Sequence, residues 1–159
     1  MEEPVGLTLV LAGVTSPHRL VESVRIAYGF RGIPVDAFVV VRATGMAAQM
    51  GVPEAYKVAL RYGKPLIVLP SARDLLEYVK FDEVYSVVPG LQSYRRVEEL
   101  RPRGSCALIF GEEGGRVEVP SEVLSIPELP PEAPPQVAIA VTLYALSRSL
   151  RTSGGSPQP

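Results

Sequence analysis

The stretch from Ser105 to Pro127 holds the residues whose types and spacing best suit the binding of a small polar molecule. Five apolar residues, Cys106 to Phe110, are typical of a strand buried on both faces. The segment Gly111–Gly115 follows with three glycines, which allow positive φ and a close approach of the backbone to a ligand. A second apolar run, Leu124–Ile126, ends at Pro127. Two such interrupted strand ends, placed side by side, predict a pocket for a flat, polar small molecule.

The elements that must position this pocket alternate between strands and helices along the chain. Strands are predicted at Leu7–Ala12, Ala37–Val41, Leu66–Leu69, Val84–Val88, Cys106–Phe110 and Leu124–Ile126. Helices are predicted at about His18–Tyr28 and Pro53–Tyr62, after a Ser71 cap, and at Gln136–Leu150. This alternation predicts a single α/β domain, with a mostly parallel sheet flanked by helices on both faces.

The predicted helix Gln136–Leu150 is apolar on nearly every side. A helix without a polar face needs two surfaces that bury it, and one of these can be the sheet. For the other we expect a second copy of the chain, which makes a homodimer through this C-terminal helix the predicted assembly. The domain is predicted to span residues 1–150, and the Gly/Ser/Pro-rich residues 151–159 to be a disordered tail.

Composition places the chain among folded proteins, since 47% of its 159 residues are hydrophobic and 21% are charged. The net charge of −1 argues against a strongly basic nucleic-acid binder, although it does not exclude a local basic patch. The one cysteine, Cys106, has no partner for an internal disulfide.

The acidic N-terminus lacks the basic flank of a secretion signal, and no apolar run approaches the roughly 18 residues that span a bilayer. We therefore expect a cytoplasmic protein with no membrane segment.

Common catalytic and nucleotide-binding fingerprints are missing from the sequence. It contains no G-x-x-x-x-G-K-[ST] loop, and the first strand is not followed by G-x-G-x-x-G. A G-x-S-x-G nucleophile motif is absent as well. The single histidine, His18, has no cysteine or histidine partners at ligand spacing. The sequence therefore predicts no metal site.

Three motifs, taken in order, give the chain a resemblance to a known family. Pro17 and Arg25 are spaced eight residues apart at the start of the first helix. Phe110, Gly111 and Glu113 then match F-G-x-E, and Ile126-Pro127 is followed by the apolar helix. In this order and spacing the chain resembles the SPOUT superfamily of S-adenosylmethionine-dependent RNA methyltransferases. The most similar branch is the SpoU type, which modifies ribose 2′-hydroxyls.

The resemblance implies a deep trefoil knot and a cofactor, S-adenosylmethionine, held among three loops near the C-terminus. It implies an RNA substrate, tRNA or rRNA, to which a methyl group is transferred. Arg25 is then expected to orient the substrate, with Glu113 as the second catalytic residue. The cofactor-binding residues expected from the resemblance are Val88, Pro89, Gly90, Gly111, Glu113, Gly114, Ile126 and Pro127, and the RNA-binding residues are Arg19, Arg42, Arg95 and Arg96.

The chain departs from the family pattern at two places. Arg19 replaces the asparagine of the first motif, and Glu132-Ala133-Pro134 aligns with the usual S-L-N stretch. These losses keep an alternative open, in which the chain is a catalytically inactive knotted module that binds RNA or S-adenosylmethionine. An unrelated α/β protein is a further alternative. Arg25 can equally be a surface charge paired with Glu22, and Glu113 can be a structural brace of its glycine loop.

Overall fold

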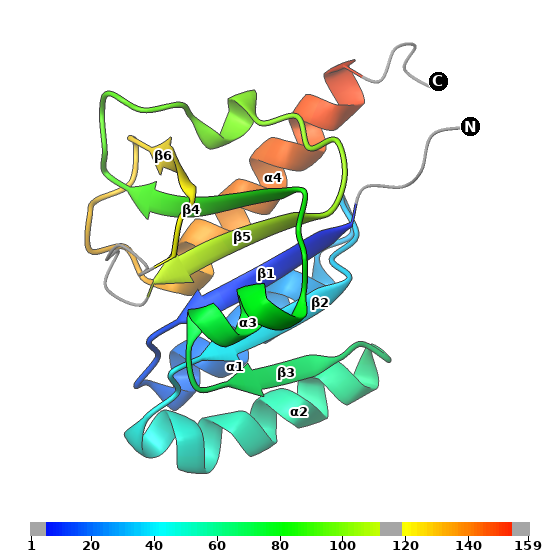
Figure 1. Ribbon diagram of the computed structural model, residues 1–159, viewed down its shortest axis with the longest axis vertical. Helices are drawn as coiled ribbons and strands as arrows, with labels where there is room; N and C mark the ends of the chain where they lie inside the picture. Colours follow the sequence, from blue (N-terminus) through cyan, green and yellow to red (C-terminus); the bar gives the residue numbers. More distant parts are fainter. Residues whose placement is uncertain (1–5, 112–118, 154–159) are drawn as a thin grey trace.

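The structure, a computed structural model, describes residues 6–111 and 119–153. Its centre is a six-stranded sheet in which every neighbouring pair is parallel (Figure 1). The strand order is β3-β2-β1-β5-β4-β6. The strands are β1 (Leu7–Ala12), β2 (Ala37–Val41), β3 (Leu66–Leu69), β4 (Glu83–Pro89), β5 (Cys106–Gly111) and β6 (Glu122–Ile126).

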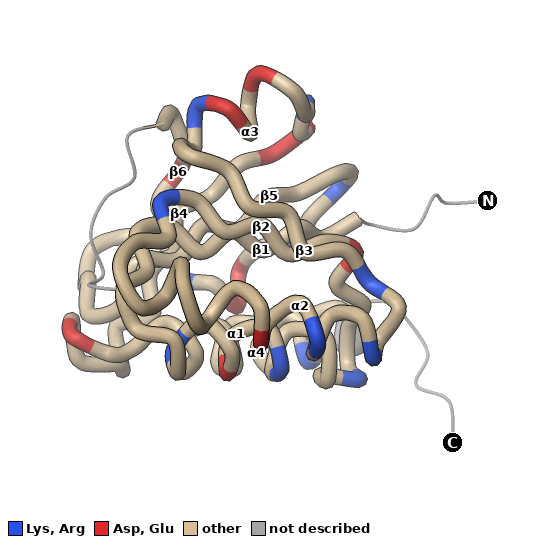
Figure 2. Tube along the Cα trace, turned by 90° about the horizontal axis from the view of Figure 1, so that it is seen from below, with Lys and Arg blue, Asp and Glu red and all other residues tan. Residues whose placement is uncertain are grey.

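Helices cover both faces of the sheet, as the two perpendicular views show (Figures 1 and 2). Three of them lie together on one face: α1 (Pro17–Gly29), α2 (Val52–Arg61) and α4 (Pro135–Ser153). The opposite face carries α3 (Ala72–Tyr78). A π-helical turn, Ala47–Gly51, leads into α2, and a 3₁₀ turn, η2 (Val97–Glu99), interrupts the connection between β4 and β5.

Alternation along the strands divides the apolar residues between two cores. In β1, Leu7, Leu9 and Leu11 join the larger core beneath α1, α2 and α4. Val10 and Ala12 point the other way, into a smaller core beneath α3. Successive strand residues face opposite sides, so a strand that is apolar throughout is buried between two layers. The larger core fixes α1 and α4 against the central strands.

Local capping explains where two of the helices start. Ser16 precedes α1, and its hydroxyl accepts a hydrogen bond from the main-chain nitrogen of Arg19 at 3.2 Å, while Pro17 occupies the first turn. Ser71 and Asp74 form a reciprocal capping box at the start of α3. The Ser71 cap predicted from the sequence is thus confirmed.

The predicted α/β architecture is confirmed, with a parallel sheet flanked by helices on both faces. The strand order does not establish the trefoil knot, which stays a prediction. The predicted disordered tail falls mainly on residues 154–159, outside the described residues. Among the described helices, none combines the length and hydrophobicity needed to cross a bilayer.

The C-terminal helix α4 is buried differently from the sequence-based expectation. Ile139, Leu143 and Leu146 are fully covered by the chain's own core. Of the large apolar side chains that α4 carries, only Val137 (38%) and Tyr144 (57%) count as exposed among those that the structure describes. The apolar character of α4 is therefore mostly explained within one chain, and the homodimer stays a prediction.

Candidate functional site

Two of the three loops expected to form the pocket lie side by side at the carboxyl ends of β4 and β6. Pro89 pairs with Ile126 in the parallel register, and the Gly90 amide donates a hydrogen bond to the Ile126 carbonyl oxygen at 2.9 Å. The side-chain amide of Gln92 donates to the Pro127 carbonyl oxygen at 3.2 Å. The loops that leave β4 and β6 are therefore joined through their backbones.

Gly90 is essential to this junction for two reasons. Its φ of +84° is a conformation that residues with a side chain rarely adopt. A β-carbon at this position would also lie 2.7 Å from Cγ of Pro131, which is closer than van der Waals contact allows. Pro131 therefore packs directly on the Gly90 backbone and fixes the loop that follows β6.

The third expected loop begins at Gly111, the last residue of β5. Gly111 pairs with Ala12 of β1, so it lies at the same edge of the sheet as Gly90 and Ile126. Glu113 and Gly114, which the sequence placed in the pocket, lie outside the described residues. The structure leaves untested whether Val88, Pro89, Gly90, Gly111, Ile126 and Pro127 bind a cofactor.

The carboxyl edge also carries a strained arginine, at the point where the strand order reverses. The chain runs outward from β1 to β2 and β3, whereas β5, β4 and β6 lie on the other side of β1. Ligands of open α/β sheets bind outside the carboxyl ends of the strands at such a point. Arg42 directly follows β2 with a φ of +54°, and its guanidinium lies over Gly13, which follows β1. Holding a residue other than glycine in this conformation costs about 1–3 kcal/mol. The surrounding structure must therefore hold Arg42 in place.

Arg25 lies away from this edge. It is an exposed residue of α1, eight positions after Pro17, or about 12 Å along the helix at 1.5 Å per residue. Among the described residues, no ion pair joins it to Glu22. One chain therefore does not bring Arg25 together with Gly90 and Ile126.

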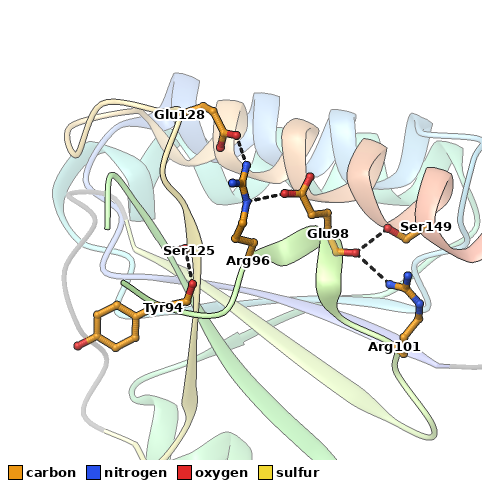
Figure 3. A network of polar contacts seen from close by, with 7 residues as sticks. All are labelled: Tyr94, Arg96, Glu98, Arg101, Ser125, Glu128 and Ser149. Carbon is orange, nitrogen blue, oxygen red and sulfur yellow. Dashed lines mark hydrogen bonds and ion pairs between the residues drawn. The ribbon is translucent and has the colours of Figure 1, made fainter. Parts of the chain in front are cut away.

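Arg95 and Arg96 are engaged by carboxylates. Arg96 lies between Glu98 and Glu128, with its Nε 2.5 Å from Glu98 Oε1 and its Nη2 bonded to Glu128 (Figure 3). Arg95 lies 3.9 Å from Glu122. These two arginines thus have part of their charge neutralised by the chain itself.

A cavity of about 630 Å³ lies beside this ion-pair cluster, between β6, η2 and α4. Its floor is apolar, with Val97, Ile126, Leu129, Val141 and Ala145. Its polar rim consists of Arg96, Glu98, Arg101, Ser125, Glu128, Tyr144, Arg148 and Ser149. The volume is in the usual range for small-molecule sites. Sequence reasoning missed this cavity because its walls come from three separate segments; the available signal was Tyr144 and Arg148, one turn apart on an otherwise apolar helix.

The groups with clearly shifted pKa values lie in the core or pack against it. Burial raises the pKa of the Cys106 thiol to about 12. Burial, followed by a hydrogen bond to Glu83, raises the pKa of Tyr85 to about 12. Burial also raises the pKa of Tyr28 to about 12. These groups stay protonated at neutral pH, so none of the three is a general base there.

Metal binding also has a clear structural requirement, namely several donor side chains that converge. Residues 6–111 and 119–153 contain no group of three or more His, Cys, Asp or Glu side chains that could hold a metal ion. The prediction of no metal site concerns the whole chain and is not tested by the described part.

Solved structures with a similar fold are methyltransferases. The fold matches the SpoU methyltransferase AviRb from Streptomyces viridochromogenes with a TM-score of 0.71 and 16% identity, over 96% of this chain and 62% of that one. The same enzyme in complex with the cofactor AdoMet matches with a TM-score of 0.66 and 17% identity, over 98% and 63%. The AdoMet-bound rRNA methyltransferase from Sinorhizobium meliloti matches with a TM-score of 0.68 and 15% identity, over 93% of this chain and 58% of that one. At these identities the likeness shows the fold alone.

Relatives by sequence carry a different description. The chain is 42% identical over 86 residues to "Putative type II restriction enzyme ApeKORF2002P" of Aeropyrum pernix, covering 54% of this chain and 53% of that protein. It is 32% identical over 79 residues to "Putative type II restriction enzyme MjaORF1200P" of Methanocaldococcus jannaschii, covering 50% of this chain and 52% of that protein. The chain thus spans about half the length of the curated relatives it matches.

These findings correct the family and the reaction expected from the sequence. Assignment to the SPOUT superfamily, and with it RNA methyl transfer, is contradicted by the sequence relatives and by a family profile that matches residues 45–145. The motifs that suggested it include a glycine and a proline at the ends of β5 and β6, and such residues report the fold and its loops and not the reaction. The matched segment covers more than half of the chain, and the chain therefore belongs to the family described as "RecB-family nuclease (DUF2122)".

Proposed function

We propose that this chain is a nucleic-acid-binding protein that contacts the phosphate backbone with the outer surface of α1 and α2. The observation that carries the proposal is a set of exposed cations on these helices and the loops that follow them (Figure 2). They are Arg25, Arg31, Lys57, Arg61 and Lys64. The family description and the names of the sequence relatives, a nuclease and restriction enzymes, support nucleic acid as the partner.

The near-neutral net charge is compatible with this surface because the charges are unevenly placed. On α1 and α2 the acidic residues are Glu22 and Glu54, and Glu54 pairs with Lys57 at 3.0 Å in an exposed contact. Exposed ion pairs are worth at most about 1 kcal/mol, so a phosphate can replace Glu54 at little cost. Most other carboxylates follow α2 in the sequence. Cations gathered on one face are the electrostatic signature of phosphate contact.

Two arginines at the carboxyl edge extend this surface in the proposal. Arg19 lies in the first turn of α1, and Arg42 is held over Gly13. Both were assigned to RNA binding from the sequence. Arg95 and Arg96 contribute less, because Glu122, Glu98 and Glu128 already balance them.

The reaction included in the proposal is phosphodiester cleavage, which the family description supports. The described residues supply no metal-binding cluster, so the proposal assigns no catalytic residue. A cleavage assay on end-labelled DNA and RNA, with Mg²⁺ and with EDTA, tests this part. Products that depend on Mg²⁺ support cleavage. Intact substrates with both Mg²⁺ and EDTA would refute the proposed cleavage, and the proposed binding is tested separately.

Binding itself is tested by fluorescence anisotropy with labelled duplex DNA and single-stranded RNA over a series of salt concentrations. Lys57→Gln/Arg61→Gln should weaken binding and reduce the slope of log K against log salt by about 2, since each lost phosphate contact removes about 0.9. Arg73→Gln/Lys80→Gln is the matched control, because it removes the same charge from α3 and its following loop on the opposite face. Equal effects of the two double variants would refute the proposed surface.

S-adenosylmethionine is the second candidate ligand, at the junction of the β4 and β6 loops. The observation that favours it is the Gly90–Ile126 hydrogen bond at the carboxyl edge of a fold whose solved examples include AdoMet complexes. Backbone donors and acceptors freed by glycine and proline suit an adenine ring. Calorimetry with S-adenosylmethionine tests this ligand. Gly90→Val should abolish binding, and no heat from the wild-type chain at millimolar ligand would remove the candidate.

A further inference from the structure

We propose that the cavity between β6, η2 and α4 binds one nucleotide unit, with its base against Tyr144 and its phosphate near Arg101 and Arg148. The inference deepens the proposed nucleic-acid binding, and it rests on that function for the source of the nucleotide. It concerns a different part of the molecule from the cations of α1 and α2, and it shares Ile126 with the Gly90–Ile126 junction.

The base would lie on an aromatic and apolar surface. Tyr144 is 57% exposed although it belongs to a helix whose neighbouring apolar residues are buried. It lines the cavity together with Val141 and Ala145 of the same helix and Leu129 from the loop after β6. Bases of single-stranded nucleic acid stack on such aromatic rings with little preference for sequence, because every base has a π-face.

The phosphate would lie beside Arg101 and Arg148, two cations that line the cavity. Arg101 Nη1 and Ser149 Oγ both donate to the Glu98 carbonyl oxygen, at 2.9 and 2.7 Å (Figure 3). This shared acceptor holds Arg101 against the C-terminal part of α4, where Arg148 adjoins Ser149. The Arg148 guanidinium lies 5.8 Å from the centre of the Tyr144 ring. Arg148 and Tyr144 are thus neighbours, and both line the same cavity as Ser149.

The carboxylates of the cavity do not oppose a phosphate there. Glu98 and Glu128 both form ion pairs with Arg96, which lies between them. Arg96 therefore offsets one of their two negative charges, and Arg101 is a further cation on the rim. Among described residues, Arg101 has hydrogen bonds only to main-chain oxygens, of Glu98 and Leu100, so its positive charge is not neutralised.

Calorimetry with adenosine 5′-monophosphate tests the site directly, with adenosine and ribose 5-phosphate as partial ligands. We expect the monophosphate to bind more tightly than either part. Tyr144→Ala should weaken it about tenfold, the usual scale of one lost base-stacking contact. Arg148→Gln should weaken the monophosphate and leave adenosine unchanged. The matched controls are Tyr78→Ala, which removes a 78% exposed tyrosine from α3, and Lys80→Gln just after that helix.

The same variants show whether the nucleotide belongs to a strand or is free. They also separate failure of this inference from failure of the proposed nucleic-acid binding. If single-stranded RNA loses affinity with Tyr144→Ala and duplex DNA does not, the site takes a base from a strand; if only the monophosphate responds, it takes a free nucleotide. Unchanged binding of every ligand by Tyr144→Ala overturns the inference, even where Lys57→Gln/Arg61→Gln still weakens nucleic acid. A dimer that Tyr144→Ala converts to monomer, with no nucleotide bound, also overturns it and assigns this face to a second copy.

Discussion

The main-chain amide of Gly90 and the carbonyl oxygen of Ile126 form a 2.9 Å hydrogen bond that joins the loops leaving β4 and β6. The bond links two segments between which the whole of β5 lies in the sequence. It holds one end of the cavity region in place, since Ile126 also lines the cavity. The stability of this junction is therefore the first property that mutation should probe.

Gly90→Ala should destabilise the protein by about 2–4 kcal/mol, combining the cost of a positive φ with the contact to Pro131. Gly45→Ala is the matched control, since Gly45 has a φ of +57° but no atom within 4 Å of the added β-carbon. Urea denaturation measures both. Equal losses of unfolding free energy would show that Pro131 yields easily and that only backbone strain matters.

Ile139→Asp should prevent folding, because it places a charge in the core at a side chain with no exposed surface. Val137→Asp, two residues earlier on α4 and 38% exposed, should fold. Circular dichroism and thermal melting separate the two results. Light scattering on Val137→Asp then tests the homodimer predicted through α4: a change from dimer to monomer supports it, and an unchanged mass places any dimer contact elsewhere.

Alkaline pH should destabilise the fold through Cys106. Its pKa is raised from 9.0 to about 12 by burial, so the folded chain keeps the thiol proton that the unfolded chain releases. The contribution is complete below pH 9 and is lost as the pH rises toward 12. Between pH 9 and 10 the unfolding free energy should fall by up to about 1.4 kcal/mol per pH unit. Cys106→Ala should remove this contribution to the slope, while it lowers stability below pH 9, where the thiol is protonated in both states.

Arg96→Gln should cost about 1 kcal/mol or less of unfolding free energy, because its side chain is 40% exposed and exposed ion pairs contribute little. Its effect on the cavity should be larger, since Glu98 and Glu128 would then carry unbalanced charge. Calorimetry with adenosine 5′-monophosphate should therefore show weaker binding by Arg96→Gln, with higher salt partly restoring it. Unchanged affinity at low salt would contradict the charge balance described for the cavity.

Much of the fold was predictable because each strand is a short apolar run with clear ends. The ranges Leu7–Ala12, Ala37–Val41 and Leu66–Leu69 were predicted with the observed bounds. The start of α3 was predictable from Ser71, because the chemistry of a helix cap is local. Signals of this kind depend on residues that are neighbours in the chain, so they can be read from a single sequence.

The candidate site was less predictable because its contacts are long-range. The sequence marks Gly90 as a turn residue, but the close contact with Pro131 appears only when the β4 and β6 loops meet. Arg96 was predicted to bind RNA, and nothing in the sequence indicated that Glu128 lies beside it in the fold. The family was misjudged for a related reason: strand-end glycines are shared by proteins that have this fold and different activities.

The position of β5 has a consequence for how the protein is made. This strand lies between β1 and β4, and its first residue, Cys106, pairs with Leu7 at the other end of the chain. During synthesis β1, β2 and β3 can pair early. The strand that joins β1 to β4 is missing until the ribosome has released the segment that ends at Gly111. Pairing across such a sequence separation is slow, so the sheet should be completed only after β5 has been synthesised.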